Sequence, residues 1–325
     1  MSYVQLRSTH VLLLAAMSAG VGCKRRPGEY NGLSDSALAD SAGVYEQQSI
    51  MFRKVGQTPN LQGPESARYD RDLDIWFVSN VNGTAIQKDN NGYISRLRPD
   101  GAPYSLKFIE GGKKGVTLNA PKGLAINGDT LWVADIDVAR AFNKRTGELI
   151  ANVGIKGRAR FLNGAAVGPD GAVYMTDTGV LFGPKGDVSH PGPDQVFRIT
   201  RAGAEAVLES SKLEGPNGIT WDPERRRFVI VSFLRQGIYA WKPGEQEVES
   251  IGSGPGGQDG VVFLPDGRLV VTSWADSSLF VLDNGKSQKV ASKVPSPADI
   301  DVDTRSSRIA VPLLMENRVE FWELP

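Results

Sequence analysis

The fold of this chain is set by residues 258–273, which read QDGVVFLPDGRLVVTS. An apolar run at 260–264 and a β-branched run at 268–273 flank a Pro-Asp-Gly turn, which is the pattern of a β-hairpin. Two further strand-like runs follow at 279–282 and 288–294, each after a turn sequence. Four short strands joined in order predict a four-stranded meander, which is the unit of a β-propeller.

The phrase that begins this unit recurs along the chain. It is found at 63–66 (GPES), 121–124 (PKGL), 162–165 (LNGA), 216–219 (PNGI), 258–261 (QDGV) and 297–300 (PADI). Successive key positions within the phrase are 39 to 57 residues apart, a period typical of repeat architectures. The sequence therefore predicts an all-β fold, a six-bladed β-propeller over residues 49–325.

The last repeat is one strand short, because its third strand-like run, 318–322, lies almost at the end of the chain. Residues 50–55 (IMFRKV) have strand character and no partner before the first repeat. A closed ring leaves no open strand edge. We therefore expect residues 49–56 to supply the outer strand of blade six and close the ring.

The charge balance excludes nucleic-acid binding as a leading function, since Lys+Arg and Asp+Glu both number 37. A multi-histidine metal centre is also excluded, because the chain has only 2 histidines. The expected partners are a small-molecule substrate or ligand, a membrane through a lipid anchor, and a protein bound at the propeller mouth.

The six key positions are expected to meet at one mouth of the central channel, just before each innermost strand. They are Glu65, Lys122, Asn163, Asn217, Asp259 and Ala298. Two carboxylates and two carboxamides facing one point would form an all-oxygen site for a hard divalent ion such as Ca²⁺. The alternative is that Asn-Gly and Asp-Gly are only turn residues.

These motifs resemble the senescence marker protein/gluconolactonase/luciferin-regenerating-enzyme family. The resemblance rests on GPESARYD (63–70), NG (163–164), PNGITW (216–221) and QDGV (258–261), and it extends over about residues 49–325. It implies that one divalent ion is held by four residues, Glu65, Asn163, Asn217 and Asp259. It further implies that the ion polarises a lactone carbonyl for attack by water, with Asp259 as ligand and general base.

Two positions depart from the family pattern. Lys122 occupies the second ring position, where it would anchor a substrate carboxylate or phosphate, or pair with Glu65 or Asp259 and replace the metal. The family's substrate arginine, two residues before Asn163, is Phe161 here. Arg160 is one residue out of register and is expected to face elsewhere if the strand is regular. This difference argues against sugar-acid lactones as substrates.

A long loop at 178–194 in blade three is expected to lie on the same mouth. His190 in this loop is a candidate substrate-binding group, because only histidine has an unperturbed pKa near neutrality. The alternative is an exposed loop histidine. Trp241, Trp274 and Trp322 are expected to pack between strands and not to contact a ligand.

Two functions follow from this sequence. The first is an exported metal-dependent hydrolase acting on a lactone or related ester. The alternative is a non-catalytic propeller lipoprotein that binds a ligand or a protein partner.

The first 23 residues are predicted to be a signal peptide. Arg7 precedes an apolar run at 11–22, which is too short to span a bilayer as a helix. The run ends at Cys23, the sole cysteine, and the sequence there resembles a bacterial lipobox, whose cysteine is lipidated. The alternative is a plain secretory signal with an incidental cysteine. Residues 24–48 are polar and small, which predicts a flexible linker.

We therefore expect a protein anchored by lipid to the bacterial outer membrane, facing the periplasm or the exterior. Cys23→Ser should abolish lipid labelling and move the protein from the membrane fraction to the soluble fraction. A wild-type protein that already fractionates as soluble, with a mature N-terminus at another residue, would contradict the lipobox interpretation.

Overall fold

The computed structural model describes residues 51–155, 157–183 and 187–324. The predicted signal peptide, Cys23 and the linker at 24–48 lie outside these residues and stay predictions. Within the described ranges, no helix is long and apolar enough to cross a membrane.

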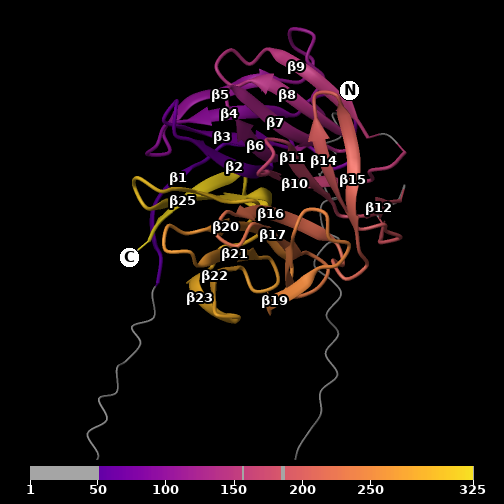
Figure 1. The fold of residues 1–325 in the computed structure, drawn as a ribbon. Helices are drawn as coiled ribbons and strands as arrows, with labels where there is room; N and C mark the ends of the chain where they lie inside the picture. Colours follow the sequence, from indigo (N-terminus) through magenta and orange to yellow (C-terminus); the bar gives the residue numbers. More distant parts are fainter. Residues whose placement is uncertain (1–50, 156, 184–186, 325) are drawn as a thin grey trace, which may run out of the picture.

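Six four-stranded antiparallel sheets form the blades of a β-propeller, so the predicted fold is confirmed (Figure 1). Blade one consists of β2 (Pro64–Asp70), β3 (Ile75–Asn80), β4 (Tyr93–Leu97) and β5 (Pro103–Glu110). Blade two consists of β6 (Pro121–Asn127), β7 (Thr130–Asp135), β8 (Val138–Asn143) and β9 (Leu149–Gly154). Blade three consists of β10 (Leu162–Val167), β11 (Val173–Asp177), β14 (Gln195–Thr200) and β15 (Gly203–Glu209). Blade four consists of β16 (Pro216–Asp222), β17 (Arg227–Ser232), β18 (Gly237–Trp241) and β19 (Glu249–Ser253). Blade five is β20 (Gln258–Phe263), β21 (Leu269–Ser273), β22 (Ser278–Asp283) and β23 (Lys286–Ser292).

Blade six joins the two ends of the propeller. Its strands lie in the order β1 (Arg53–Thr58), β26 (Arg318–Glu323), β25 (Arg308–Leu313) and β24 (Asp301–Asp303). In Figure 1 the indigo β1 lies beside the yellow C-terminal strands. The predicted closure by an N-terminal outer strand is therefore confirmed, although this strand begins later and ends two residues beyond the predicted position 56.

The innermost strand of each of blades one to five contains a register shift at the repeated phrase, for example between Leu162 and Ala165. In four blades the phrase carries a glycine that lies against the next blade. A Cβ on Gly123, Gly164, Gly218 or Gly260 would overlap the backbone carbonyl of Asn163, Asn217, Asp259 or Ala298, respectively. Glycine is required at these positions because neighbouring inner strands approach so closely.

Apolar side chains from facing blades fill the space between the sheets. Tyr174 of blade three packs on Phe228 of blade four, with ring centroids 4.5 Å apart, and Phe228 stacks on Trp241 at 5.6 Å. Trp241 and Trp322 are buried, as the sequence predicts. This packing fixes the blades around the channel and makes its mouth a rigid frame.

Removal of β1 should destabilise the propeller, because it exposes the edge of β26 and removes Phe52 from the core of blade six. A chain that begins at residue 59 should melt at least about 5 °C below one that begins at residue 51, or aggregate. Differential scanning calorimetry of the two purified chains tests this. Equal melting temperatures would contradict ring closure by β1.

Candidate active site

Five of the six key positions lie at the start of an inner strand, and Ala298 lies three residues before β24. None of them is an exposed turn residue, since each is 6% exposed or less. Because each strand starts at the same mouth, four blades bring the side chains of Glu65, Asn163, Asn217 and Asp259 toward the axis. The interpretation of Asn-Gly and Asp-Gly as simple turn residues is therefore wrong.

Each of these four residues has a buried oxygen without a hydrogen-bond partner among the described residues. The atoms are Glu65 Oε2, Asn163 Oδ1, Asn217 Oδ1 and Asp259 Oδ1. A buried acceptor left unpaired costs about 1–3 kcal/mol, so four such atoms in one place need an explanation. Two carboxylates and two amide carbonyls form a donor set that fits a hard divalent ion such as Ca²⁺.

The amide of Asn163 is oriented by Thr178 of the same blade, which is itself bonded to the neighbouring blade. Its Nδ2 donates to Thr178 Oγ1 at 3.1 Å, and Thr178 donates in turn to the Pro216 carbonyl at 2.9 Å. The first of these hydrogen bonds occupies the amide nitrogen of Asn163 and leaves its Oδ1 free. No group of three or more His, Cys, Asp and Glu side chains in the described ranges is arranged to hold a metal. The donor set proposed here depends instead on two asparagines.

Burial and mutual repulsion dominate the electrostatics of the two carboxyls. The pKa of Glu65 is raised well above its usual value by burial and then by the negative charge of Asp259. Burial and the charge of Asp299 likewise raise the pKa of Asp259, while the adjacent Trp274 and Asn217 side chains act in the opposite direction. A bound cation would relieve this repulsion, which the protein alone leaves largely uncompensated.

Lys122 lies in the ring but forms no ion pair with Glu65 or Asp259 within the described part of the chain. Its ammonium donates to the Ala120 carbonyl at 3.2 Å and lies over the Phe161 ring, 4.2 Å from its centroid. Burial lowers the pKa of Lys122 to about 8, although the charge of Glu65 acts in the opposite direction. The direct pairing that would replace a metal is therefore absent from this arrangement.

The channel behind the carboxyls contains a separate ion pair. Arg68 Nη2 donates to Asp299 Oδ2 at 2.9 Å, and the Ser66 hydroxyl donates to the same oxygen at 2.6 Å. Arg68 Nε also donates to the Leu124 carbonyl at 2.9 Å. These contacts tie blades one, two and six together beneath the mouth.

His190 is paired within its own loop and not with the ring. Its Nε2 lies 2.7 Å from Asp194 Oδ1, four residues further along the chain. Trp274, by contrast, follows β21 at the mouth and packs edge-on against Phe233 at 5.7 Å. Its indole nitrogen lies near the Asp259 carboxyl without completing a hydrogen bond to it. The expectation that Trp274 serves only in packing is therefore incomplete.

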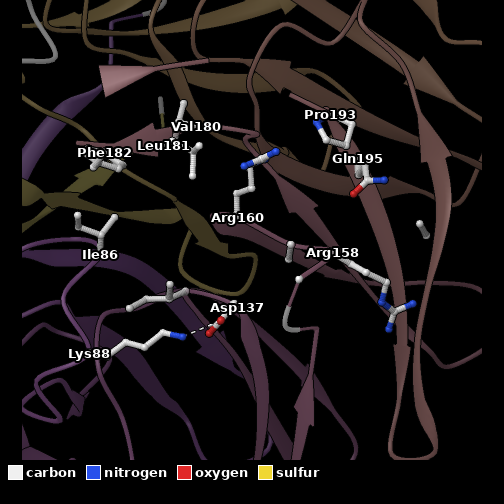
Figure 2. Close-up of a pocket in the computed structure, with 14 residues that line it drawn as sticks. Ile86, Lys88, Asp137, Arg158, Arg160, Val180, Leu181, Phe182, Pro193 and Gln195 are labelled. Atoms are coloured by element: carbon white, nitrogen blue, oxygen red, sulfur yellow. Dashed lines mark hydrogen bonds and ion pairs between the residues drawn. The ribbon is translucent and has the colours of Figure 1, made fainter. Parts of the chain in front are cut away.

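A cavity of about 590 Å³ opens at the same mouth between the loops of blades one, two and three (Figure 2). Arg160 lines this cavity beside the ring, and strand alternation does not set its direction. The reason is that β10 begins only at Leu162, and the Asp177 carboxylate accepts the backbone N–H groups of Arg160 and Phe161 at 2.9 and 2.8 Å. The residue in the sequence that could have indicated this arrangement is Asp177, at the end of the adjacent strand β11.

The fold and the ring of buried oxygens define a six-bladed propeller with a polar site at the mouth of its channel. The family model described as the SMP-30/gluconolactonase/LRE-like region matches residues 64–302. The chain belongs to this family.

Two solved structures support the fold. A gluconolactonase from Xanthomonas campestris is 16% identical with a TM-score of 0.63, over 85% of this chain and 91% of that chain. A catalytically inactive virginiamycin B lyase from Staphylococcus aureus with quinupristin is 15% identical with a TM-score of 0.58, over 85% of this chain and 100% of that chain. No curated protein matches the sequence.

The raised pKa values predict how the metal-free protein responds to pH. Glu65 and Asp259 stay protonated to higher pH when folded than when unfolded, so the folded state binds more protons above about pH 4. The free energy of unfolding should therefore fall as pH rises from there through the raised pKa values. Asp259→Asn should reduce this fall, as measured by urea unfolding in chelator at pH 5 and pH 8.

Asp283→Asn is the matched control, because Asp283 is exposed on the outer face of blade five. It should follow the wild-type pH dependence. Superimposable profiles for wild type and Asp259→Asn would show that the Asp259 carboxyl is not held at a raised pKa.

Proposed function

We propose that this protein is a divalent-metal-dependent hydrolase that acts on a lactone or related ester. The observation that carries the proposal is the set of four unpartnered buried oxygens contributed by four blades. Membership in the gluconolactonase-like family and the structural likeness to a gluconolactonase support the class of reaction. We further propose that the protein is exported and anchored through Cys23, as the sequence predicts.

In this proposal Glu65, Asn163, Asn217 and Asp259 hold the ion, for which Ca²⁺ is the expected species. When bound, a divalent ion supplies Lewis-acid polarisation of the substrate carbonyl and lowers the pKa of a coordinated water. Trp274 presents an N–H beside Asp259, where it can orient a carbonyl or leaving-group oxygen. Burial of all four ligands keeps bulk water away from the reacting centre.

Asp259 is the proposed general base. It takes the proton from the attacking water and returns it to the alkoxide released when the carbonyl carbon–oxygen bond breaks. Lys122 is buried in the ring, and its positive charge would attract a substrate carboxylate or phosphate to the mouth.

Loss of Asp259 should remove both metal binding and activity. Ca²⁺ at a hundredfold excess over its dissociation constant should stabilise the wild type by about 2.7 kcal/mol, and Asp259→Ala should abolish this gain. Asn217→Ala removes a neutral ligand and should weaken the gain less. Thermal melts with and without Ca²⁺, together with a panel of lactones and esters, measure the two effects.

Asn127→Ala is the matched control for the asparagine, because Asn127 lies at the far end of β6. It should retain the calcium shift and the activity. A wild-type protein with no bound ion and no shift in millimolar Ca²⁺ would contradict the metal-hydrolase proposal and favour the non-catalytic binding propeller.

Lys122→Ala tests the substrate-anchoring role of this lysine against the metal-replacing role that the sequence also allowed. If Lys122 anchors substrate, the variant should bind Ca²⁺ as tightly as wild type or more tightly, while activity falls. If the lysine replaces the metal, wild type should show no calcium shift and the variant should gain one.

A further inference from the structure

The cavity beside the ring combines a cationic side with an apolar side. Arg158 and Arg160 line one part, and Ile86, Leu181 and Phe182 line another. In Figure 2 the three apolar side chains lie on the opposite side of the view from Arg158, with Arg160 between them. Its volume of about 590 Å³ is within the usual range for a small-molecule site.

The guanidinium groups retain free donors. Arg160 Nε donates to the Gly192 carbonyl at 2.6 Å, and Arg158 Nη2 donates to the Ala204 carbonyl at 3.2 Å. Neither guanidinium forms an ion pair with a carboxylate in the described residues. The other two charges of the lining neutralise each other, because Lys88 and Asp137 form an ion pair of 2.6 Å. The cavity therefore presents a surplus of positive charge.

The apolar wall is also incompletely covered. Ile86 and Leu181 are 37% and 42% exposed, which is high for large aliphatic side chains at a concave surface. Burial of these side chains against an apolar ligand would be favourable by the area it removes from water. A ligand that suits both walls is an amphiphile with an anionic end.

Phe161 joins this cavity to the central ring. Its ring lies 5.5 Å from that of Phe182, which lines the cavity, and the Lys122 ammonium lies over the same Phe161 ring. Arg160 is the next residue in the chain. A substrate whose ester group reached the ring would have to extend past Phe161 to enter the cavity.

We propose that this cavity is a specificity subsite that selects an amphiphilic substrate bearing a carboxylate. The terminal nitrogens of Arg160 bind the carboxylate, and Leu181 and Phe182 contact the apolar segment. A guanidinium edge matches the two oxygens of a carboxylate, which makes this pairing stronger than a neutral hydrogen bond. This inference rests on the proposed hydrolase function, whose substrate class it specifies.

The kinetic test compares two esters with the same reacting group, one with a free carboxylate and one with that carboxylate amidated. Wild type should prefer the anionic ester in kcat/KM. Arg160→Gln should reduce this preference by about tenfold or more, chiefly through KM of the anionic ester. Arg71→Gln, an exposed arginine in the β2–β3 turn at the other end of the blade, is the control and should keep the preference.

A binding test separates failure of this inference from failure of the proposed function. Octanoate should bind wild type and Asp259→Asn equally in calorimetric titrations, and at least about tenfold more weakly to Arg160→Gln. Hydrolysis without Arg160-dependent octanoate binding or anionic preference would overturn the subsite and leave the hydrolase standing. Octanoate binding that depends on Arg160, without hydrolysis of any ester, would support the carboxylate site and overturn the hydrolase.

Discussion

The close approach of neighbouring inner strands is the constraint on which the site depends. Where Gly164 and Gly218 stand, the next blade places a backbone carbonyl in the space that a Cβ would fill. That carbonyl belongs to Asn217 or Asp259, the residue whose side chain faces the axis. Steric exclusion between blades therefore fixes the backbone of Asn217 and Asp259, and their side-chain oxygens are directed to the axis as a consequence. The same glycine that permits packing makes the preceding residue a ring position.

Bringing the Glu65 and Asp259 carboxyls together is electrostatically unfavourable, and the nearby cationic side chains compensate this only in part. Arg68 lies deeper in the channel and pairs with Asp299, so its charge is largely committed there. Lys122 is turned toward Phe161 and the Ala120 carbonyl. Glu65 and Asp259 are left with raised pKa values and one free oxygen each. A protein interior tolerates such a cluster when a cation or bound ligand compensates it, which is why we interpret the cluster as functional.

The sequence was sufficient for the parts of the molecule that repeat. The six phrases predicted the blades, and the missing strand of the last repeat predicted closure by a segment near residue 53. The positions of Glu65, Asn163, Asn217 and Asp259 followed from the same repeat, because each begins an inner strand. Their roles as metal ligands stay predictions.

The loops could not be predicted in this way, because contacts between segments set them. Alternation along a strand says nothing of Arg160, which precedes β10 and is held by Asp177 from the adjacent strand. His190 has a carboxylate partner in its own loop, so its reach toward the ring is limited by a contact that no spacing rule reveals. Trp274 was predicted to pack, and it does, but its nitrogen also lies beside Asp259.

Phe161 shows how the mouth differs from the pattern that the family implies. An aromatic ring stands where that pattern has a substrate arginine, yet positive charge is not lost from this part of the site. The Lys122 ammonium lies over the Phe161 ring, and the Arg160 side chain lines the neighbouring cavity. The guanidinium belongs to the preceding residue, Arg160, and the position of the family's arginine is occupied by Phe161, which packs on Phe182. The proposed subsite would therefore favour a substrate that is larger and less polar than a sugar acid, with its anionic group held away from the ring.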